Sequence, residues 1–337
     1  MGDPLNLTSM RKAVLLYNAR SGGRRTQRKS DLRDALSVLA DAGVEAAITV
    51  TESSSDAAEQ ARKAITEGCD TVFACGGDGT IHDVLQGMAG TRVPLGIVPM
   101  GTANALAHDL GLPLEPAKAV RAVIDGEHRR VALGRLQAIA LDGKLTIRYF
   151  TVAVGVGVDA HLFYKLHSGM KQRMGMAAYY AKAWHLWFTH RMERFSVMCS
   201  NGSTAQVSRR DVTEMLAVRI RNFGGVVREL APGASLDRND LRVVVCRTSN
   251  RLTYLMYVTR GLLGAAFGVP GVELVYSDRV KCDYTLKSAQ GSKEAEDAAP
   301  SPRVYVEADG ELVGTLPAEI TIVPDALTLL APKRYRP

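Results

Sequence analysis

A carboxylate set among glycines, in the stretch Cys75-Gly76-Gly77-Asp78-Gly79-Thr80, is the feature of this chain most suited to chemistry. An apolar run over 71–74 leads into it, and apolar residues at helical spacing follow it, which predicts a strand, a turn and a helix. The helical residues are Ile81, Val84, Leu85 and Met88. Glycines leave the backbone free to adopt positive φ and to approach a ligand closely. The start of the helix offers free N–H groups and a positive dipole end, so the stretch predicts an anion site, most simply for phosphate.

A second stretch repeats this arrangement. Residues 94–98 predict a buried strand, which ends in Pro99-Met100-Gly101-Thr102-Ala103-Asn104 before another helical pattern. In a parallel sheet both turns would open at the same edge, where ligands bind. Neither is a Walker A loop, because no Lys-Ser/Thr follows, and His82 stands where dinucleotide-binding turns have a third glycine. Taken alone, the first stretch is equally a tight turn with a solvated Asp78.

Four motifs in order resemble the diacylglycerol kinase catalytic-domain family, which includes bacterial diacylglycerol kinase-like lipid kinases and the sphingosine and ceramide kinases. The motifs are Tyr17–Gly23, Gly76–Thr80, Pro99–Ala107 and Val306–Glu311, and the resemblance runs from about Lys12 to about Pro332. In the first motif Ala19 replaces the family's usual proline. The resemblance implies an α/β N-terminal domain with a parallel sheet, as in NAD kinases and diacylglycerol kinases, and a β-sandwich C-terminal domain.

The resemblance also implies a lipid kinase that uses ATP and Mg²⁺ and transfers the γ-phosphate to a lipid hydroxyl, as in diacylglycerol or a sphingoid base. It places the proton acceptor at Asp309 with Glu311 in support, while Asp78 holds Mg²⁺ through a water or orients the acceptor hydroxyl. The nucleotide-binding residues expected are Asn18, Ser21, Gly22, Thr51, Gly76, Gly77, Asp78, Gly79, Thr80, Thr102 and Asn104. Asp309-Gly310 alone predicts a hairpin turn, and both roles are compatible. Because Asp309 lies in the second domain, we expect domain closure to assemble the site.

The chain departs from the family in two places. Many members have a structural Mg²⁺ site around a Leu-Asp-Asp-Gly-Leu stretch, where this chain has Leu236-Asp237-Arg238-Asn239-Asp240-Leu241. Asp237 and Asp240 remain the candidate metal ligands, and the cation at Arg238 opposes them. Ala105 stands where many members have an Asp, a variant that resembles the sphingosine-kinase-like branch.

Two other functions remain open from the sequence. An NAD kinase-like enzyme shares the Gly-Gly-Asp-Gly-Thr motif, although the second motif has the lipid-kinase form. A nucleotide- or lipid-binding protein without catalysis agrees with the altered stretch at 236–241 and disagrees with the intact Asp78 and Asp309. The sequence does not identify the lipid, its acyl chains or the oligomeric state.

Strand and helix patterns alternate up to Ile124, and short alternating runs follow from Val131. This predicts an α/β domain over 10–130 and a β-sandwich over 131–332. The resemblance implies that the first binds the nucleotide and the second the lipid substrate. A basic, aromatic segment near 162–194 predicts a helical insertion that either covers one end of the sandwich or lies at a membrane interface. Residues 288–302 are polar and predict a mobile loop.

Composition limits the setting in which the protein works. No apolar run approaches the roughly 18 residues of a membrane span, and the first residues lack the pattern of a signal peptide. Five cysteines without C-x-x-C spacing favour reduced thiols in the cytoplasm over disulfides or zinc. The net charge of +7 comes without nucleic-acid-binding motifs, so we expect transient contact with an anionic membrane surface.

Overall fold

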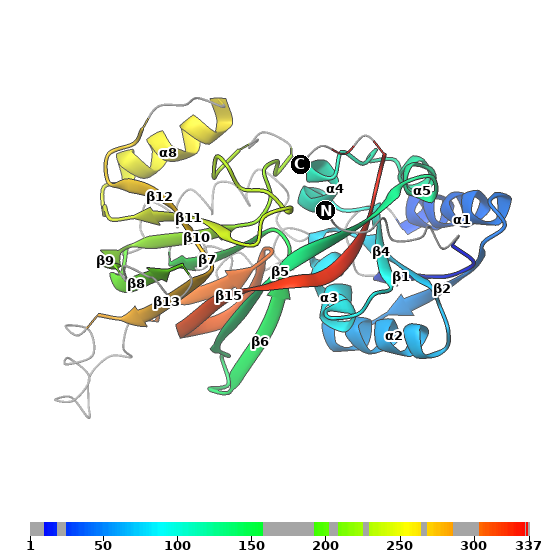
Figure 1. The fold of residues 1–337 in the computed structure, drawn as a ribbon, viewed down its shortest axis with the longest axis horizontal. Helices are drawn as coiled ribbons and strands as arrows, with labels where there is room; N and C mark the ends of the chain where they lie inside the picture. The colour runs from blue at the N-terminus through cyan, green and yellow to red at the C-terminus, as the bar shows by residue number, and fades with distance from the viewer. Residues whose placement is uncertain are drawn as a thin grey trace.

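The computed structural model describes residues 10–18, 25–157, 192–201, 208–224, 229–263, 268–285, 303–333 and 335. These residues form an α/β lobe and a β-sandwich lobe that lie side by side (Figure 1). The strands of both lobes belong to one continuous hydrogen-bonded sheet system. The predicted fold class, an α/β domain with a parallel sheet followed by a β-sandwich, is confirmed.

The α/β lobe is built on parallel strands in the order β2-β1-β3-β4. Its elements are β1 (Lys12–Asn18), α1 (Arg25–Asp41), β2 (Glu45–Thr51), α2 (Ser54–Thr66), β3 (Thr71–Gly76), α3 (Asp78–Met88), β4 (Pro94–Pro99), α4 (Ala105–Asp109) and α5 (Pro116–Ile124). β3 and β4 are buried along their whole length, which explains their near-continuous apolar sequences. Helix α1 packs beside α5, and α2 packs beside α3 on the other face of the sheet.

The ends of two helices follow local signals in the sequence. Gly43 follows α1 with φ of 75°, the left-handed conformation that ends many helices. The Ser53 hydroxyl accepts a hydrogen bond from the N–H of Asp56 at 3.2 Å and caps α2. Because β1, β2, β3 and β4 run parallel, their carboxyl ends meet at one edge of the sheet, as the two glycine motifs require.

The second lobe is an antiparallel sandwich. Its elements are β5 (Glu127–Ile139), β6 (Leu145–Phe150), β7 (Ala153–Gly157), β8 (Phe195–Ser200), β9 (Ser208–Val212), β10 (Glu214–Val218), β11 (Leu241–Cys246), α8 (Arg251–Leu263), β12 (Val272–Ser277), β13 (Arg279–Tyr284), β14 (Tyr305–Ala308) and β15 (Glu311–Ala331). One layer runs β12-β11-β10-β7-β14-β15, and the other runs β9-β8-β13-β15-β5-β6. Strand β15 is shared, because 311–315 pair with β14 and 318–321 pair with β13. Apolar side chains of both layers fill the space between them, including Phe150, Phe195, Met215, Val243, Val280 and Val306.

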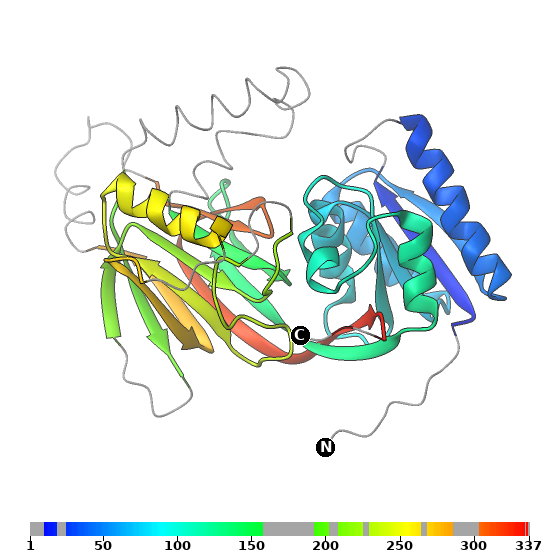
Figure 2. The ribbon, with the colours of Figure 1, turned by 90° about the horizontal axis from the view of Figure 1, so that it is seen from above.

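Two long strands join the lobes. Leu327–Ala331 of β15 pair with the start of β5, and Thr328 and Leu329 of β15 also pair in parallel with Pro94 and Leu95 of β4. The end of the chain thus extends the sheet of the first lobe, and β5 and β15 can be followed from one lobe to the other in Figure 2. The predicted boundary between 130 and 131 falls inside β5.

Some predicted elements differ from the structure. Short runs in the sequence do not correspond one to one with strands: 320–323 and 327–330 both belong to β15, whereas 148–158 is divided between β6 and β7. Helix α8 has no counterpart in the sequence prediction. The proposed insertion at 162–194 lies outside the described residues except for its last three, and the predicted loop at 288–302 lies wholly outside them.

Within the described part of the chain, no helix has both the length and the apolar character needed to cross a membrane. All five cysteines are free thiols, and four of them are buried. Burial alone raises the pKa of the Cys75 thiol, so this residue is an inert core side chain beside the first glycine motif.

Candidate active site

The first glycine motif connects β3 to α3, and Gly77 is the N-cap residue of that helix. Of the two freedoms that glycine gives, positive φ is not used here: Gly77 has φ of −93°, and neither Gly76 nor Gly79 adopts positive φ. The need for glycine at Gly77 and Gly79 is explained instead by the close approach of neighbouring groups. A Cβ at Gly77 would lie 3.1 Å from the Cα of Gly101, and one at Gly79 would lie 2.5 Å from Oε1 of Glu311.

The two glycine motifs form one unit at the carboxyl ends of β3 and β4. The N–H of Met100 donates to the carbonyl of Gly76 at 2.8 Å. Asp78 accepts a hydrogen bond through Oδ1 from the N–H of Ala105 at 2.7 Å, so a side chain of the first motif binds the backbone that follows the second. Asn104 adopts φ of 50° and braces its own turn, accepting from the N–H of Gly101 at 2.9 Å and donating to its carbonyl at 3.0 Å.

The environment of Asp78 is that of a partly desolvated carboxylate. Burial raises the pKa of Asp78, the N–H of Ala105 opposes that rise, and the negative charge of Asp309 adds to it. The last effect shows that Asp309, from the second lobe, lies close enough to Asp78 for the two charges to interact.

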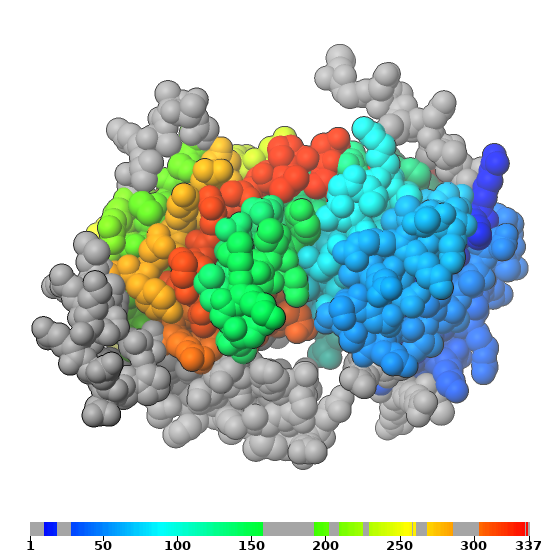
Figure 3. All heavy atoms as spheres, turned by 90° about the horizontal axis from the view of Figure 1, so that it is seen from below, coloured from blue at the N-terminus to red at the C-terminus, as the bar shows by residue number. Residues whose placement is uncertain are grey.

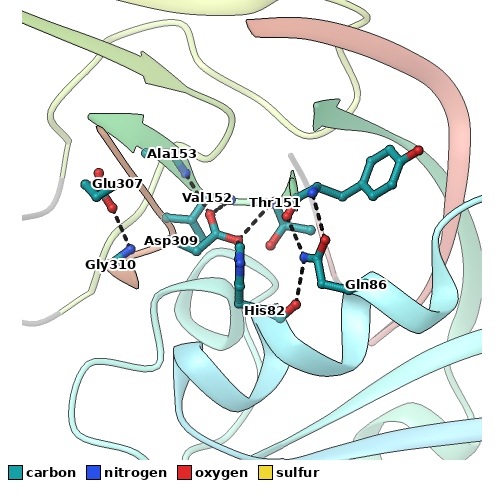
Figure 4. A network of polar contacts seen from close by, with 9 residues as sticks. His82, Gln86, Thr151, Val152, Ala153, Glu307, Asp309 and Gly310 are labelled. Carbon is teal, nitrogen blue, oxygen red and sulfur yellow. Dashed lines mark hydrogen bonds and ion pairs between the residues drawn. The ribbon is translucent and has the colours of Figure 1, made fainter. Parts of the chain in front are cut away.

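Asp309 lies in the turn between β14 and β15. Asp309 and Gly310 have φ of 51° and 83°, as expected for a tight hairpin with an Asp-Gly turn. Its carboxylate lies in a cradle of backbone N–H groups (Figure 4). Oδ1 accepts from Val152 at 2.9 Å and Ala153 at 3.1 Å, and Oδ2 accepts from Thr151 at 3.1 Å. The hairpin therefore turns this carboxylate toward the first motif.

His82 completes the surroundings of Asp309. Its Nδ1 lies 3.3 Å from Oδ2 of Asp309, with side-chain exposures of 4% and 2% for the two residues. An ionised carboxylate only accepts hydrogen bonds, so this contact requires the hydrogen of His82 to be on Nδ1. The four contacts then fill the roughly four acceptor positions of the Asp309 carboxylate.

Sequence reasoning missed this role of His82. In the sequence, His82 is noted only as the residue that stands where dinucleotide-binding turns have a third glycine. The available signal is its place four residues after Asp78, on the same face of α3. Its partner is 227 residues away, which no local pattern shows.

A second contact fixes α3 against the sandwich. The Gln86 amide donates to the carbonyl of Tyr149 at 2.8 Å and accepts from the N–H of Tyr149 at 2.9 Å. Figure 3 shows the same relation at the surface, where the hairpin containing β6 lies against the helices of the first lobe. The expectation that domain closure assembles the site therefore needs correction, because Asp309 already contacts α3 in this structure.

The carboxylates that follow and precede Asp309 have different surroundings. Glu311 is exposed, and its Oε1 lies beside Gly79 in the first turn of α3, where a helix favours negative charge. Glu307 is buried and accepts a hydrogen bond from the N–H of Gly310 at 2.8 Å, which holds the hairpin turn.

The expected nucleotide-binding residues are only partly assembled. Asn18 and Thr51 are register partners at the ends of β1 and β2, on the same sheet edge as the glycine motifs. Thr51 is 1% exposed and its hydroxyl has no hydrogen-bond partner among the described residues. Thr80 and Asn104 are also buried, and Thr102 is exposed. Ser21 and Gly22 lie outside the described residues.

The two candidate ligands of a structural metal are paired with arginines. Asp237 accepts from Arg129 at 3.2 and 3.3 Å, and Asp240 accepts two bonds of 2.7 Å from Arg238. No group of three or more His, Cys, Asp or Glu side chains in the described residues is placed to hold a metal ion. The metal site expected at Asp237 and Asp240 does not form in the described structure.

Comparisons with known proteins divide the chain as the fold does. Residues 12–136 match the diacylglycerol kinase catalytic domain, and residues 152–331 match the YegS C-terminal NAD kinase beta sandwich-like domain. A diacylglycerol kinase of Bacillus subtilis (strain 168) is 27% identical over 327 residues, covering 96% of this chain and 97% of the relative.

Two further comparisons agree with this result. A diacylglycerol kinase of Staphylococcus aureus (strain MRSA252) is 34% identical over 178 residues, 52% of this chain and 53% of the relative. The crystal structure of a diacylglycerol kinase from Bacillus anthracis str. Sterne superposes with a TM-score of 0.68 at 19% identity, over 96% of this chain and 97% of that one. The last comparison shows a shared fold across both lobes.

Proposed function

The chain belongs to the family that joins a diacylglycerol kinase catalytic domain to a YegS-type C-terminal β-sandwich, and we propose that it transfers the γ-phosphate of ATP to a lipid hydroxyl. As a member of this family it is a lipid kinase, a phosphotransferase that acts on an alcohol group. We propose diacylglycerol as the first acceptor, because the matched relatives are named diacylglycerol kinases. A sphingoid base is the second acceptor to test.

The observation that carries the proposal is the position of Asp309 at the start of α3. Phosphoryl transfer requires a phosphate-binding turn, a divalent cation and a group that receives the proton of the acceptor. The N-terminal end of α3, with its positive dipole, suits the phosphates, and Asp309 approaches that helix from the other lobe through His82. The acceptor hydroxyl would then lie between nucleotide and carboxylate.

In this scheme the hydroxyl oxygen of the lipid attacks the γ-phosphorus, its proton passes to Asp309, and ADP leaves as the bond to the β-phosphate oxygen breaks. Because all the acceptor positions of Asp309 are filled, one contact must yield to the substrate. The contact to His82 is the longest, at 3.3 Å, and the other three come from backbone. Oδ2 is therefore the oxygen that we assign to proton transfer.

Mg²⁺ bound with the nucleotide would neutralise charge on the phosphate oxygens. Such ions are commonly held by one or two carboxylates together with phosphates, and Asp78 and Glu311 fit this pattern because both flank the first turn of α3. Asn18, Thr51, Thr80 and Thr102 remain the proposed nucleotide contacts of the described residues, together with Gly76, Gly77 and Gly79. Asn104 acts on the turn itself through Gly101.

We place the reaction at a membrane surface on the cytoplasmic side, because the substrate is a lipid and the chain carries a charge of +7. The test is incubation with γ-labelled ATP and, separately, dispersed diacylglycerol, sphingosine and NAD, followed by identification of the labelled product. We expect label in the diacylglycerol sample and about a hundredfold slower labelling with Asp309→Asn. Label only in NAD would replace the proposal by the NAD kinase alternative, and binding of ATP without labelled product in any sample would favour the non-catalytic one.

A further inference from the structure

Arg219 is the largest side chain that the described part of the chain buries completely. It directly follows β10, and its guanidinium group binds backbone oxygens only in the contacts seen. Nη1 donates to the carbonyls of Arg238 at 2.7 Å and Asp240 at 2.8 Å. Nη2 donates to the carbonyls of Leu236 and Ala132, both at 3.0 Å. The guanidinium thus binds the carbonyls of residues 236, 238 and 240 and links them to Ala132 of β5.

Converging carbonyl oxygens are the ligands that a hard divalent cation prefers. The segment 236–240 is also where the family resemblance implies a structural Mg²⁺. The residues present do not fit that ion, because Asp237 is directed to Arg129 and Asp240 to Arg238. The carbonyls that face inward are already used by Arg219.

Charge leads to the same result. Burial lowers the pKa of Arg219 to about 10, so the guanidinium still carries its charge at neutral pH. A divalent ion among the same oxygens would be repelled by that charge and by the charge of Arg238. The side chain of Arg238 lies over the ring of Tyr276, with 4.0 Å between Cζ and the ring centroid.

We propose that the guanidinium of Arg219 takes the place of a structural divalent cation in this loop. The protein then has no structural metal here, and the only divalent ion that its reaction needs is the one that arrives with the nucleotide. Arg129 and Arg219 together fix the segment to β5, the strand that runs through both lobes.

Metal content and thermal stability of the wild-type protein test this without measuring activity. The protein is treated with EDTA, dialysed and examined by elemental analysis and thermal unfolding, with and without added Mg²⁺ or Ca²⁺. A structural ion present at 100 times its Kd would raise Tm by about 4 °C. We expect no stoichiometric metal and the same Tm in all samples. Retained metal, or a Tm that falls in EDTA and recovers with Mg²⁺, would overturn the proposal.

Variants of Arg219 test whether its guanidinium stabilises the segment 236–240. Arg219→Met removes the charge and leaves four carbonyls, two of them buried, without this donor, so we expect Tm to fall by about 6 °C or more. Arg242→Met is the matched control, because Arg242 is half-buried in the same region, donates to the carbonyl of Pro232 and also stacks on Tyr276. Equal shifts in the two variants would show that Arg219 has no special role.

Arg219→Lys keeps the charge but cannot reach four carbonyls at once, so its Tm should lie between the wild type and Arg219→Met. This variant also serves if Arg219→Met does not fold. A Lys variant as stable as the wild type would mean that charge alone suffices and that the four-carbonyl geometry does not matter. Because these readouts are thermal, they are independent of whether the proposed kinase activity is found.

Discussion

His82 and Asp309 form a buried pair that joins the two lobes, with Nδ1 of the imidazole 3.3 Å from Oδ2 of the carboxylate. His82 belongs to α3, which begins at the turn proposed to bind phosphate, and Asp309 belongs to the hairpin of the sandwich. The pair therefore fixes the distance between the place where a phosphate would bind and the group proposed to take the proton.

If His82 acts by positioning Asp309, its N–H group matters more than its ring. His82→Asn can still offer an N–H at similar reach, so we expect kcat within about fivefold of the wild type. His82→Leu leaves Oδ2 without this partner, and we expect kcat to fall by about tenfold or more, with KM for ATP little changed. Steady-state kinetics with both substrates varied measures this.

The comparison between Asn and Leu separates positioning from proton transfer. Should His82→Asn lose as much turnover as His82→Leu, the ring itself takes part in moving the proton.

Asp309→Asn keeps the shape of the side chain and removes its capacity as a base. We expect turnover to fall by about 10²-fold or more with ATP affinity retained. The amide group also turns a donor toward the N–H of Thr151, so Tm should fall by a few degrees. Glu307→Gln is the control, since that carboxylate is buried in the same hairpin and bonds to Gly310. Equal losses of turnover in both variants would mean that the hairpin matters and the base does not.

The parts of this fold that sequence predicts best are those with strong local patterns. β3 and β4 are short apolar runs buried on both faces, and Ser53 and Gly43 mark helix ends through their own chemistry. The continuity of β15 is not predicted by local patterns, because Pro324-Asp325 is typical of a turn. In the structure Asp325 has φ of 51° within an irregularity of the β5 pairing, and Arg130 binds it at 2.8 Å, so the strand continues.

In the candidate site, too, local motifs are predictable from the sequence and long-range contacts are not. The two glycine motifs and Asp309 are identified by residue type and spacing. Their mutual arrangement depends on contacts between residues far apart in sequence, such as Gln86 with Tyr149 and Arg219 with Ala132. No periodicity encodes such pairs, and a lone buried Arg or His carries no local signal of its partner.

Gly77→Val tests whether the two glycine turns must touch. The branched side chain needs the space in which the Cα of Gly101 lies, 3.1 Å from a Cβ at this position, so it would push the second motif away. We expect ATP affinity to fall at least tenfold and Tm to fall by several degrees. Gly268→Val is the control, because a Cβ there has open space. A folded Gly77→Val variant with unchanged ATP affinity would remove the first motif from the nucleotide site.

Attraction to an anionic surface predicts a dependence on lipid charge and salt. With a charge of +7, the protein should be more active on vesicles that contain phosphatidylserine or phosphatidylglycerol than on neutral ones. Added salt should reduce this gain, because the Debye length is about 10 Å at 0.1 M and shortens as salt rises. Activity on a dispersed short-chain diacylglycerol is the control for direct effects of salt. Equal rates on neutral and anionic vesicles would show that the charge does not serve membrane contact.

The last prediction concerns Asp109, which ends α4 and accepts hydrogen bonds from the N–H groups of Arg221 and Asn222, both at 2.9 Å. Burial raises the pKa of Asp109, and these N–H groups and the hydroxyl of Tyr335 only partly oppose the rise. A carboxyl whose pKa is raised on folding stabilises the folded state below its unfolded pKa of about 4, and that contribution is lost as pH rises through the folded pKa. Asp109→Asn does not titrate, so its free energy of unfolding should increase relative to the wild type as pH rises from about 4 toward 7. Urea unfolding across this range measures the difference, with Asp41→Asn, at an exposed position, as the control for loss of one charge. A difference that shrinks with rising pH would mean that the two N–H groups stabilise the ionised carboxylate more than burial destabilises it.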